Sequence, residues 1–170
     1  MRSIGAIAGA ALVTAAAVSG LSAGSARADN NPAINGTYTA TSNGEWARTN
    51  DSYHDEHSVR STWTVSSSCS NPLTCSGSVT SDQGWTADLT FDTQSWFVRR
   101  DVPNWEPCWD GTAATGSQIY RFFPIDPATG FMSVGSTTFA GEDATTGPSG
   151  ACGYNKQLVI RMPFKLEKIG

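Results

Sequence analysis

The sequence predicts an all-β domain of about eight antiparallel strands, stapled by disulfides and arranged as a small barrel or a sandwich. Three observations predict this fold class. Apolar and polar residues alternate with a period of two, turn residues separate the alternating runs, and all four cysteines follow the first apolar segment. Alternation places one face of a strand on a core and the other face in water. Helical periodicity is absent after the first apolar segment, so no helical layer is expected.

The chain begins with the pattern of a secretory signal peptide. Arg2 precedes an uncharged apolar run over residues 4–18, and small polar residues then lead to Ala26-Arg27-Ala28. This run is too short to span a bilayer, which takes about 20 apolar residues, and A-x-A is typical of a cleavage site. We predict a signal peptide over residues 1–28, cleaved after Ala28, and a single secreted domain over residues 29–170. No cysteine stands at the cut to carry a lipid anchor.

The predicted secreted domain is acidic. Without Arg2 and Arg27, nine basic residues remain against fifteen acidic ones, a net charge of −6. Nucleic-acid binding draws its affinity from phosphate neutralisation by basic residues, so a nucleic-acid partner is excluded. No second long apolar segment occurs, so no membrane span is expected in the secreted part.

The strands are expected in the following order along the chain. Alternation is clearest over residues 59–66, 85–92 and 158–167, and weaker strands are expected over residues 36–41, 76–80, 95–100, 117–123 and 131–139. Residues 141–153, rich in Gly, Thr and Ser, are expected to form a long loop. Because Pro163 cannot donate a ladder hydrogen bond, the last strand is expected to lie at an edge or to carry a bulge. Eight strands suit a closed meander, a size that can enclose one small ligand.

The four cysteines predict two disulfides, because an even number in an exported chain forms a disulfide framework. Three pairings are open. We favour Cys69–Cys75, since Asn71-Pro72 between them is a turn signal, and this choice leaves Cys108–Cys152. A zinc site is the alternative, but the spacings do not resemble a pair of C-x₂-C motifs.

Candidate ligand-binding residues are Arg99, Arg100, Trp105 and Trp109. Two adjacent guanidinium groups at a strand end can hold an anionic head group, and tryptophans on a loop pinned by a disulfide can form a ligand platform. The alternative is structural: the arginines form a charged strand end, and the tryptophans cap one end of the barrel or cover the disulfide. Trp63 and Trp85 lie in the apolar phase of strands and are expected in the core.

The remaining sequence carries no specific chemical motif. His54 and His57, flanked by carboxylates, are weak metal ligand candidates, since on a strand positions three apart face opposite sides. Gly147-Pro148-Ser149-Gly150 departs from the G-x-S-x-G elbow, because Ala151 stands where the last glycine belongs. Carboxylates are scattered singly, so nothing selects the pair that a glycosidase needs. No catalytic residue, resident metal or cofactor is predicted.

Two resemblances are present. Cys75-Ser76-Gly77-Ser78-Val79-Thr80-Ser81 before Gly84-Trp85, followed by Cys108-Trp109-Asp110-Gly111-Thr112, resembles small exported proteins of mycobacteria and related actinobacteria. That resemblance implies an exported compartment and this type of fold, and it implies no activity. Gly44-x-Trp46 is similar to the G-x-W motif of lipocalins, which implies a lipocalin-like barrel.

The leading functional hypothesis is a non-enzymatic extracytoplasmic binding domain. Its expected ligand is a small apolar or amphipathic molecule in the barrel, or a component of the cell envelope on the loops. The alternative is a cell-wall carbohydrate binder or hydrolase that uses loop tryptophans and an acidic pair. A secreted effector acting on host proteins is a third hypothesis, on which no sequence motif bears.

Overall fold

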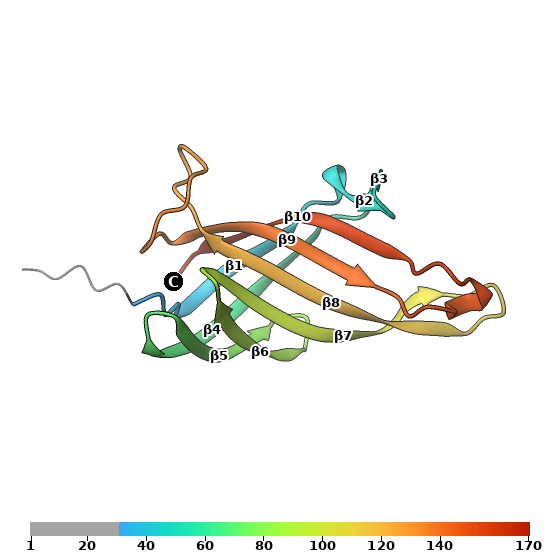
Figure 1. Cartoon of the computed structure of the whole chain (residues 1–170), viewed down its shortest axis with the longest axis horizontal. Helices are drawn as coiled ribbons and strands as arrows, with labels where there is room; N and C mark the ends of the chain where they lie inside the picture. Colours follow the sequence, from blue (N-terminus) through green and yellow to red (C-terminus); the bar gives the residue numbers. More distant parts are fainter. Residues whose placement is uncertain (1–30) are drawn as a thin grey trace, which may run out of the picture.

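The computed structural model describes residues 31–170 (Figure 1). The predicted signal peptide and its cleavage after Ala28 lie outside these residues. The described chain forms ten strands and two 3₁₀ turns. The long strands are β1 (Gly36–Ser42), β4 (Val59–Asn71), β5 (Thr74–Ser81), β6 (Thr86–Asp92), β7 (Ser95–Pro107), β8 (Ala113–Pro124), β9 (Thr138–Thr146) and β10 (Val159–Lys168). Two-residue strands β2 (Arg48–Thr49) and β3 (Ser52–Tyr53) and the turns η1 (Gly44–Trp46) and η2 (Ala151–Gly153) complete the set.

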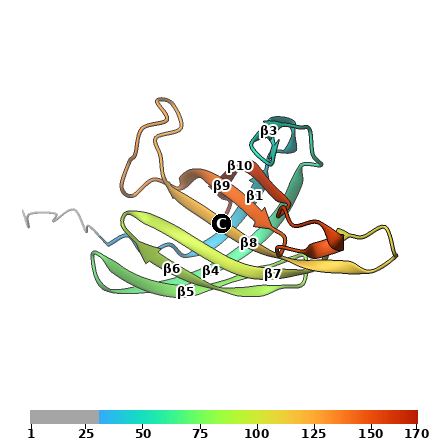
Figure 2. The same ribbon diagram turned by 45° about the vertical axis from the view of Figure 1, so that its right-hand side comes forward.

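The eight long strands close into an antiparallel barrel, so the fold class predicted from the sequence is confirmed, as a barrel rather than a sandwich. Each long strand pairs with the next one along the chain, and β10 then pairs with β1. Closure runs from Tyr38 opposite Lys168 to Ser42 opposite Phe164. The short strands β2 and β3 continue the sheet beside β10 outside the closed ring. Figure 2 shows the meander from a second direction.

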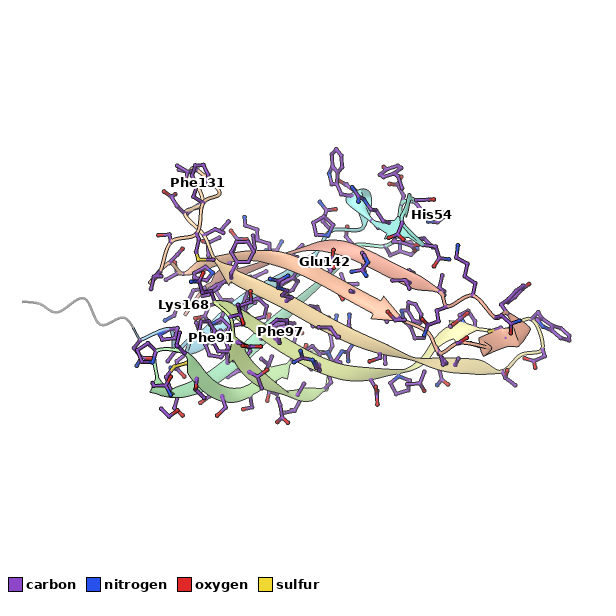
Figure 3. All side chains as sticks on the ribbon, in the orientation of Figure 1. His54, Phe91, Phe97, Phe131, Glu142 and Lys168 are labelled. Atoms are coloured by element: carbon purple, nitrogen blue, oxygen red, sulfur yellow. A yellow bond between two sulfur atoms is a disulfide. The ribbon has the colours of Figure 1, made fainter. Side chains whose placement is uncertain are left out.

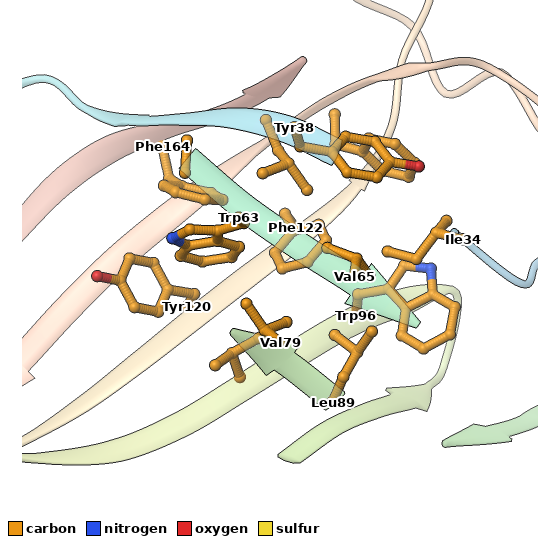
Figure 4. Packing of buried hydrophobic residues seen from close by; sticks show 14 of the residues in the cluster. Ile34, Tyr38, Trp63, Val65, Val79, Leu89, Trp96, Tyr120, Phe122 and Phe164 are labelled. Carbon is orange, nitrogen blue, oxygen red and sulfur yellow. The ribbon is translucent and has the colours of Figure 1, made fainter. Parts of the chain in front are cut away.

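Aromatic side chains fill the interior of the barrel. Trp63 is fully buried, and its ring centroid lies 4.9 Å from that of Tyr120, 5.3 Å from Phe164 and 5.4 Å from Trp85. Its indole N–H donates to Ser61 Oγ at 3.0 Å. Figure 4 shows Trp63 among Phe164, Tyr120 and Phe122, with Val79 and Leu89 below. The middle of the barrel is therefore a packed core, which corrects the expectation of a ligand enclosed at its centre.

The expectation of a strand over residues 131–139 is wrong for most of that range. A turn closes Asp126 onto Gly130 (N to O 2.7 Å), a second closes Ser133 onto Ser136 (3.2 Å), and β9 begins only at Thr138. The strand then continues to Thr146, into the segment that was expected to be a loop. The inward positions of β9 after Phe139 are Gly141, Asp143 and Thr145, so small and polar residues concealed the alternation.

Pro163 lies in a strand with neighbours on both sides, so the expected edge position or bulge is wrong. β10 pairs with β9 without a register shift, and Glu142 stands opposite Pro163. The carbonyl of Pro163 accepts from Asn43 N, at the place where β1 leaves the barrel. The nitrogen and carbonyl of one residue point to the same side of a strand. The missing N–H of Pro163 therefore faces the point where regular pairing with β1 has ended, and no ladder bond is lost.

Both predicted disulfides are confirmed. Cys69–Cys75 links β4 to β5, and Cys108–Cys152 links the end of β7 to η2. Within residues 31–170, the structure contains no helix with the length and apolar character needed to cross a membrane.

Candidate functional site

Arg99 and Arg100 point to opposite faces of β7. Arg99 is exposed, and its guanidinium lies 4.7 Å from the centroid of the Phe97 ring on the outer surface. Arg100 points inward, 4.4 Å from the centroid of the Trp85 ring, and its Nε donates to Gln118 Oε1 at 2.7 Å. The two guanidinium groups therefore do not form one anion site.

Arg100 begins a chain of polar contacts inside the barrel. Gln118 Nε2 donates to Asp143 Oδ1 at 2.8 Å, and Ser42 Oγ donates to Asp143 Oδ2 at 2.7 Å. Asp143 is only 1% exposed. Burial raises the pKa of its carboxyl, and the Ser42 and Gln118 hydrogen bonds and the Arg100 charge oppose that rise. Burial likewise raises the pKa of the neighbouring Tyr120 phenol well above its ordinary range.

This polar chain joins four strands across the interior and already satisfies the Asp143 carboxylate. Trp85 is half-buried between Arg100 and the Tyr120 ring, which is stacked at 6.3 Å and 13°. Its indole N–H is buried and has no hydrogen-bond partner among residues 31–170. These side chains pack against the end of the aromatic core. None of them lines either pocket found among residues 31–170.

Trp105 and Trp109 lie in different environments at the far end of the β7–β8 hairpin. Trp105 is half-buried against β8: a Cβ placed on Gly116 would lie 2.8 Å from Trp105 Cδ2. Trp109 is 84% exposed beside the Cys108–Cys152 disulfide. Their role in ligand binding stays a prediction, and the aromatic rings that Arg99 and Arg100 contact are Phe97 and Trp85 instead.

The two histidines lie on the linker between β1 and β4, away from the barrel interior. His54 is exposed, with Nδ1 3.0 Å from Glu56 Oε1, and His57 is exposed as well. Figure 3 shows His54 on this projecting segment. No group of three or more His, Cys, Asp or Glu side chains suited to a metal occurs among residues 31–170.

An apolar pocket of about 460 Å³ opens at the other end of the barrel. Its floor is the end of the aromatic core, where Tyr38, Trp96 and Phe139 are at most 3% exposed. Its rim comes from the turn between β4 and β5 and from the loop between β8 and β9. The apolar rim residues are Pro72, Leu73, Met132 and Val134. This volume lies within the range of about 300–1,000 Å³ that is usual for ligand sites.

The pocket is walled on one side by the arm over residues 31–35, which is fastened to β4. Ser67 Oγ lies 2.8 Å from both the amide N and the carbonyl O of Ile34, and Asn35 Oδ1 accepts from Ser67 N at 2.7 Å. The Cys69–Cys75 disulfide holds the hairpin that carries Leu73. The short disulfide therefore supports the pocket rim, whereas Cys108–Cys152 lies at the opposite end.

Several rim side chains are exposed despite being apolar. Leu73 is 74% exposed, Val134 64% and Met132 47%, and Phe131 on the same loop is 77% exposed. Figure 3 shows Phe91 and Lys168 at this end of the barrel, with Phe131 on the loop that projects above them. Clustered exposed apolar residues around a cavity are typical of a binding mouth.

This pocket is not predicted by the sequence. Leu73 stands in a two-residue turn, Val134 stands within the tight turn that joins Ser133 to Ser136, and Met132 falls in the range where a strand is expected from the sequence. The available signal was the presence of large apolar side chains inside turn-forming segments, such as Pro72-Leu73 and Ser133-Val134-Gly135. Only the register of the barrel shows that these turns meet at one end.

The fold and the pocket define the chain as a disulfide-stapled, eight-stranded antiparallel barrel with an apolar pocket at one end. Among solved structures, the monomer form of the Mycobacterium tuberculosis PknI sensor domain is similar. It has a TM-score of 0.57 and 18% sequence identity, over 81% of this chain and 88% of that chain. At this identity the likeness concerns the fold.

No protein-family model matches the chain. No curated protein matches it either. The structural neighbour comes from a mycobacterium, the group of organisms to which the sequence resemblance points, and it gives no support to the similarity with lipocalins. Trp46 of the G-x-W motif is 67% exposed in η1, outside the barrel core.

Proposed function

We propose that the domain works outside the cytoplasm as a binding module and holds a small apolar or amphipathic ligand in the end pocket. The observation that carries the proposal is the apolar pocket of about 460 Å³, with buried aromatic residues at its floor and exposed apolar residues at its rim. Two disulfides support an oxidising compartment. The similarity to a sensor domain supports a binding role by analogy of fold.

The proposed ligand position differs from that in a lipocalin-like barrel, where the ligand is enclosed at the centre, because Trp63 and its neighbours fill the centre of this barrel. A ligand would lie on the end of the core, against Tyr38, Phe91 and Trp96, between the β4–β5 turn and the β8–β9 loop at the rim. An apolar chain placed there removes exposed apolar surface from water, at about 25 cal/mol per Å². This contribution favours chain-bearing molecules over small polar ones.

The test is ligand extraction and native mass spectrometry of the purified protein, together with titration by a fluorescent apolar probe. A Val134→Asp variant should weaken probe binding, because it places a charge on the apolar rim. Val59→Asp is the control, since Val59 is 37% exposed at the opposite end of β4 and does not line the pocket. No co-purifying ligand and equal probe binding by both variants would contradict the proposal.

A second candidate function, that of a cell-wall carbohydrate binder, is favoured by exposed aromatic residues at the opposite end of the barrel. Trp109 is 84% exposed and Tyr154 66% exposed, on the two segments that Cys108–Cys152 joins. Exposed aromatic rings on a rigid tip suit stacking against a sugar face. Retention of the protein on insoluble cell-wall glycan, lost in Trp109→Ala and kept in Val134→Asp, would favour this candidate over the end pocket.

A further inference from the structure

Among residues 31–170, one charged residue lines the end pocket, Lys168. The other polar lining side chains are neutral: Asn31, Asn35, Tyr38, Gln94, Ser136 and Thr137. Lys168 lies at the end of β10, opposite Tyr38 of β1, and its amide donates to the carbonyl of Thr137 at 3.0 Å. Its backbone is therefore fixed both to the barrel wall and to the loop that forms the rim.

The ammonium of Lys168 has no ion-pair partner within residues 31–170. Three ion pairs occur among these residues, and Lys168 takes part in none of them. By contrast, Lys165 on the same strand is paired, with its Nζ 2.7 Å from Glu167 Oε1. The predicted secreted domain is acidic overall, yet no Asp or Glu side chain of residues 31–170 lines the pocket. The mouth of the pocket therefore combines an apolar floor with a single open positive charge.

We propose that the ligand is a single-chain amphiphile with a carboxylate head, held by Lys168 at the mouth while its chain lies on the aromatic floor. This inference rests on the proposed function of the same pocket. A lysine stem can run along apolar surface and keep its ammonium at the water boundary, which places the charge where a head group would emerge.

The head group follows from the donors at the mouth. Phosphate recognition in proteins typically uses several donors at once, such as a bidentate arginine, a nest of backbone N–H groups or a helix N-terminus. The pocket lining contains no arginine, and no helix of residues 31–170 ends there. One ammonium with neutral amide and hydroxyl neighbours matches a monoanionic carboxylate. The cavity of about 460 Å³ lies in the lower half of the usual range, which favours one chain over two.

The experiment compares three probes of equal chain length on the full domain: dodecanoate, dodecanol and dodecyl phosphate, each titrated below its aggregation concentration by calorimetry. The wild-type protein should bind dodecanoate about threefold to tenfold more tightly than dodecanol at low salt. In Lys168→Gln this preference should vanish while dodecanol binding stays the same. Lys156→Gln, which removes an exposed lysine at the opposite end of the barrel and the same unit of charge, should behave as wild type.

The outcomes separate the two proposals. If dodecanol binds and dodecanoate has no advantage, or if Lys168→Gln keeps the advantage, the carboxylate assignment is overturned and the apolar pocket stands. Tighter binding of dodecyl phosphate than dodecanoate overturns the carboxylate in favour of a phosphate head. Binding of none of the three probes overturns both the inference and the proposed function.

Discussion

Ser42 on β1 donates a hydrogen bond of 2.7 Å to the buried carboxylate of Asp143 on β9, across the interior of the barrel. The two residues are 101 positions apart in sequence, and β10 lies between their strands. Gln118 supplies a second donor, so both carboxylate oxygens are bonded. The contact ties the two sides of the β10 strand together beneath the sheet.

Asp143→Asn should stabilise the domain increasingly as the pH rises. Burial raises the pKa of Asp143, so the folded state binds more protons than the unfolded state just above the ordinary aspartate range. In the wild-type protein, the contribution of Asp143 to the free energy of unfolding is largest below about pH 4, where the carboxyl is protonated in both states. This contribution is lost as the pH rises through the pKa of the folded state. Asn keeps the size of the side chain and can accept from Gln118, and it carries no charge.

The measurement is urea unfolding of both proteins between pH 4 and pH 8. The difference in unfolding free energy, variant minus wild type, should grow with pH and then level off. Ser42→Ala serves as the control, because it removes one donor to the carboxylate and keeps the titrating group. A difference that stays constant over this range would show that Asp143 does not titrate abnormally.

Removal of Cys108–Cys152 should cost more stability than removal of Cys69–Cys75. The chain-entropy model assigns about 4 kcal/mol to the longer loop and about 2.4 kcal/mol to the shorter one. Urea midpoints of Cys108→Ala/Cys152→Ala and Cys69→Ala/Cys75→Ala test the order.

Removal of the two disulfides should also have different effects on ligand binding. Loss of Cys69–Cys75 frees the hairpin of Leu73 at the pocket rim, so apolar probe affinity should fall in that variant. Loss of Cys108–Cys152 acts at the other end and should leave probe affinity unchanged. The reverse pattern would move the binding mouth to the opposite end of the barrel.

Trp63→Ala should destabilise the domain by about 3–5 kcal/mol or prevent folding, because it opens a cavity among at least four aromatic rings. Trp109→Ala should change stability by less than about 0.5 kcal/mol, since the ring is 84% exposed. Thermal unfolding followed by circular dichroism distinguishes the two. Equal losses would mean that Trp109 contributes packing that its exposure does not show.

Gly116→Ala should displace Trp105. The new Cβ would lie 2.8 Å from Trp105 Cδ2 and 2.8 Å from Thr145 Cγ2, closer than side-chain carbons approach. Overpacking of this kind costs about 1–3 kcal/mol, and the fluorescence of the indole should shift to the red as it meets water. Thr115→Ala, on the exposed neighbouring position, is the control.

A double variant checks the cause of this loss. If the clash with Trp105 is responsible, adding Trp105→Ala to Gly116→Ala should cost less than the sum of the two single changes. Simple additivity would point to Thr145 or to the backbone of β8 as the source.

The fold was predictable from the sequence because alternation follows directly from strand geometry. Trp63 is expected on the inner face by its phase alone, Leu89 and Phe164 hold the apolar phase of the other clearly alternating runs, and each of the three is at most 3% exposed. The same parity could have separated Arg99 from Arg100, since Val98 is apolar and Arg100 shares its phase. Alternation failed in β9, where Gly141 and Asp143 occupy inward positions and interrupt the apolar pattern.

The pocket was not predictable, because it depends on which turns meet at one end. Leu73, Val134 and Lys168 are far apart in sequence and belong to three separate segments. Their proximity follows from closure of the barrel and from the hydrogen bond between Lys168 N and Thr137 O. Local patterns describe a strand or a turn, whereas a cavity is a property of the assembled sheet.

The closing pair of strands has a kinetic consequence. Most neighbours in the barrel are successive hairpins, which form within microseconds, but β1 must also find β10, with Tyr38 opposite Lys168. Such a remote contact makes loop closure the slow event in folding. Until it occurs, the edges of β1 and β10 are open to other chains, so refolding yield should fall with protein concentration. Lys168 and the residues beside β1 line the pocket, so a ligand would bind only the closed barrel. Binding would therefore stabilise the closed barrel against opening between β1 and β10.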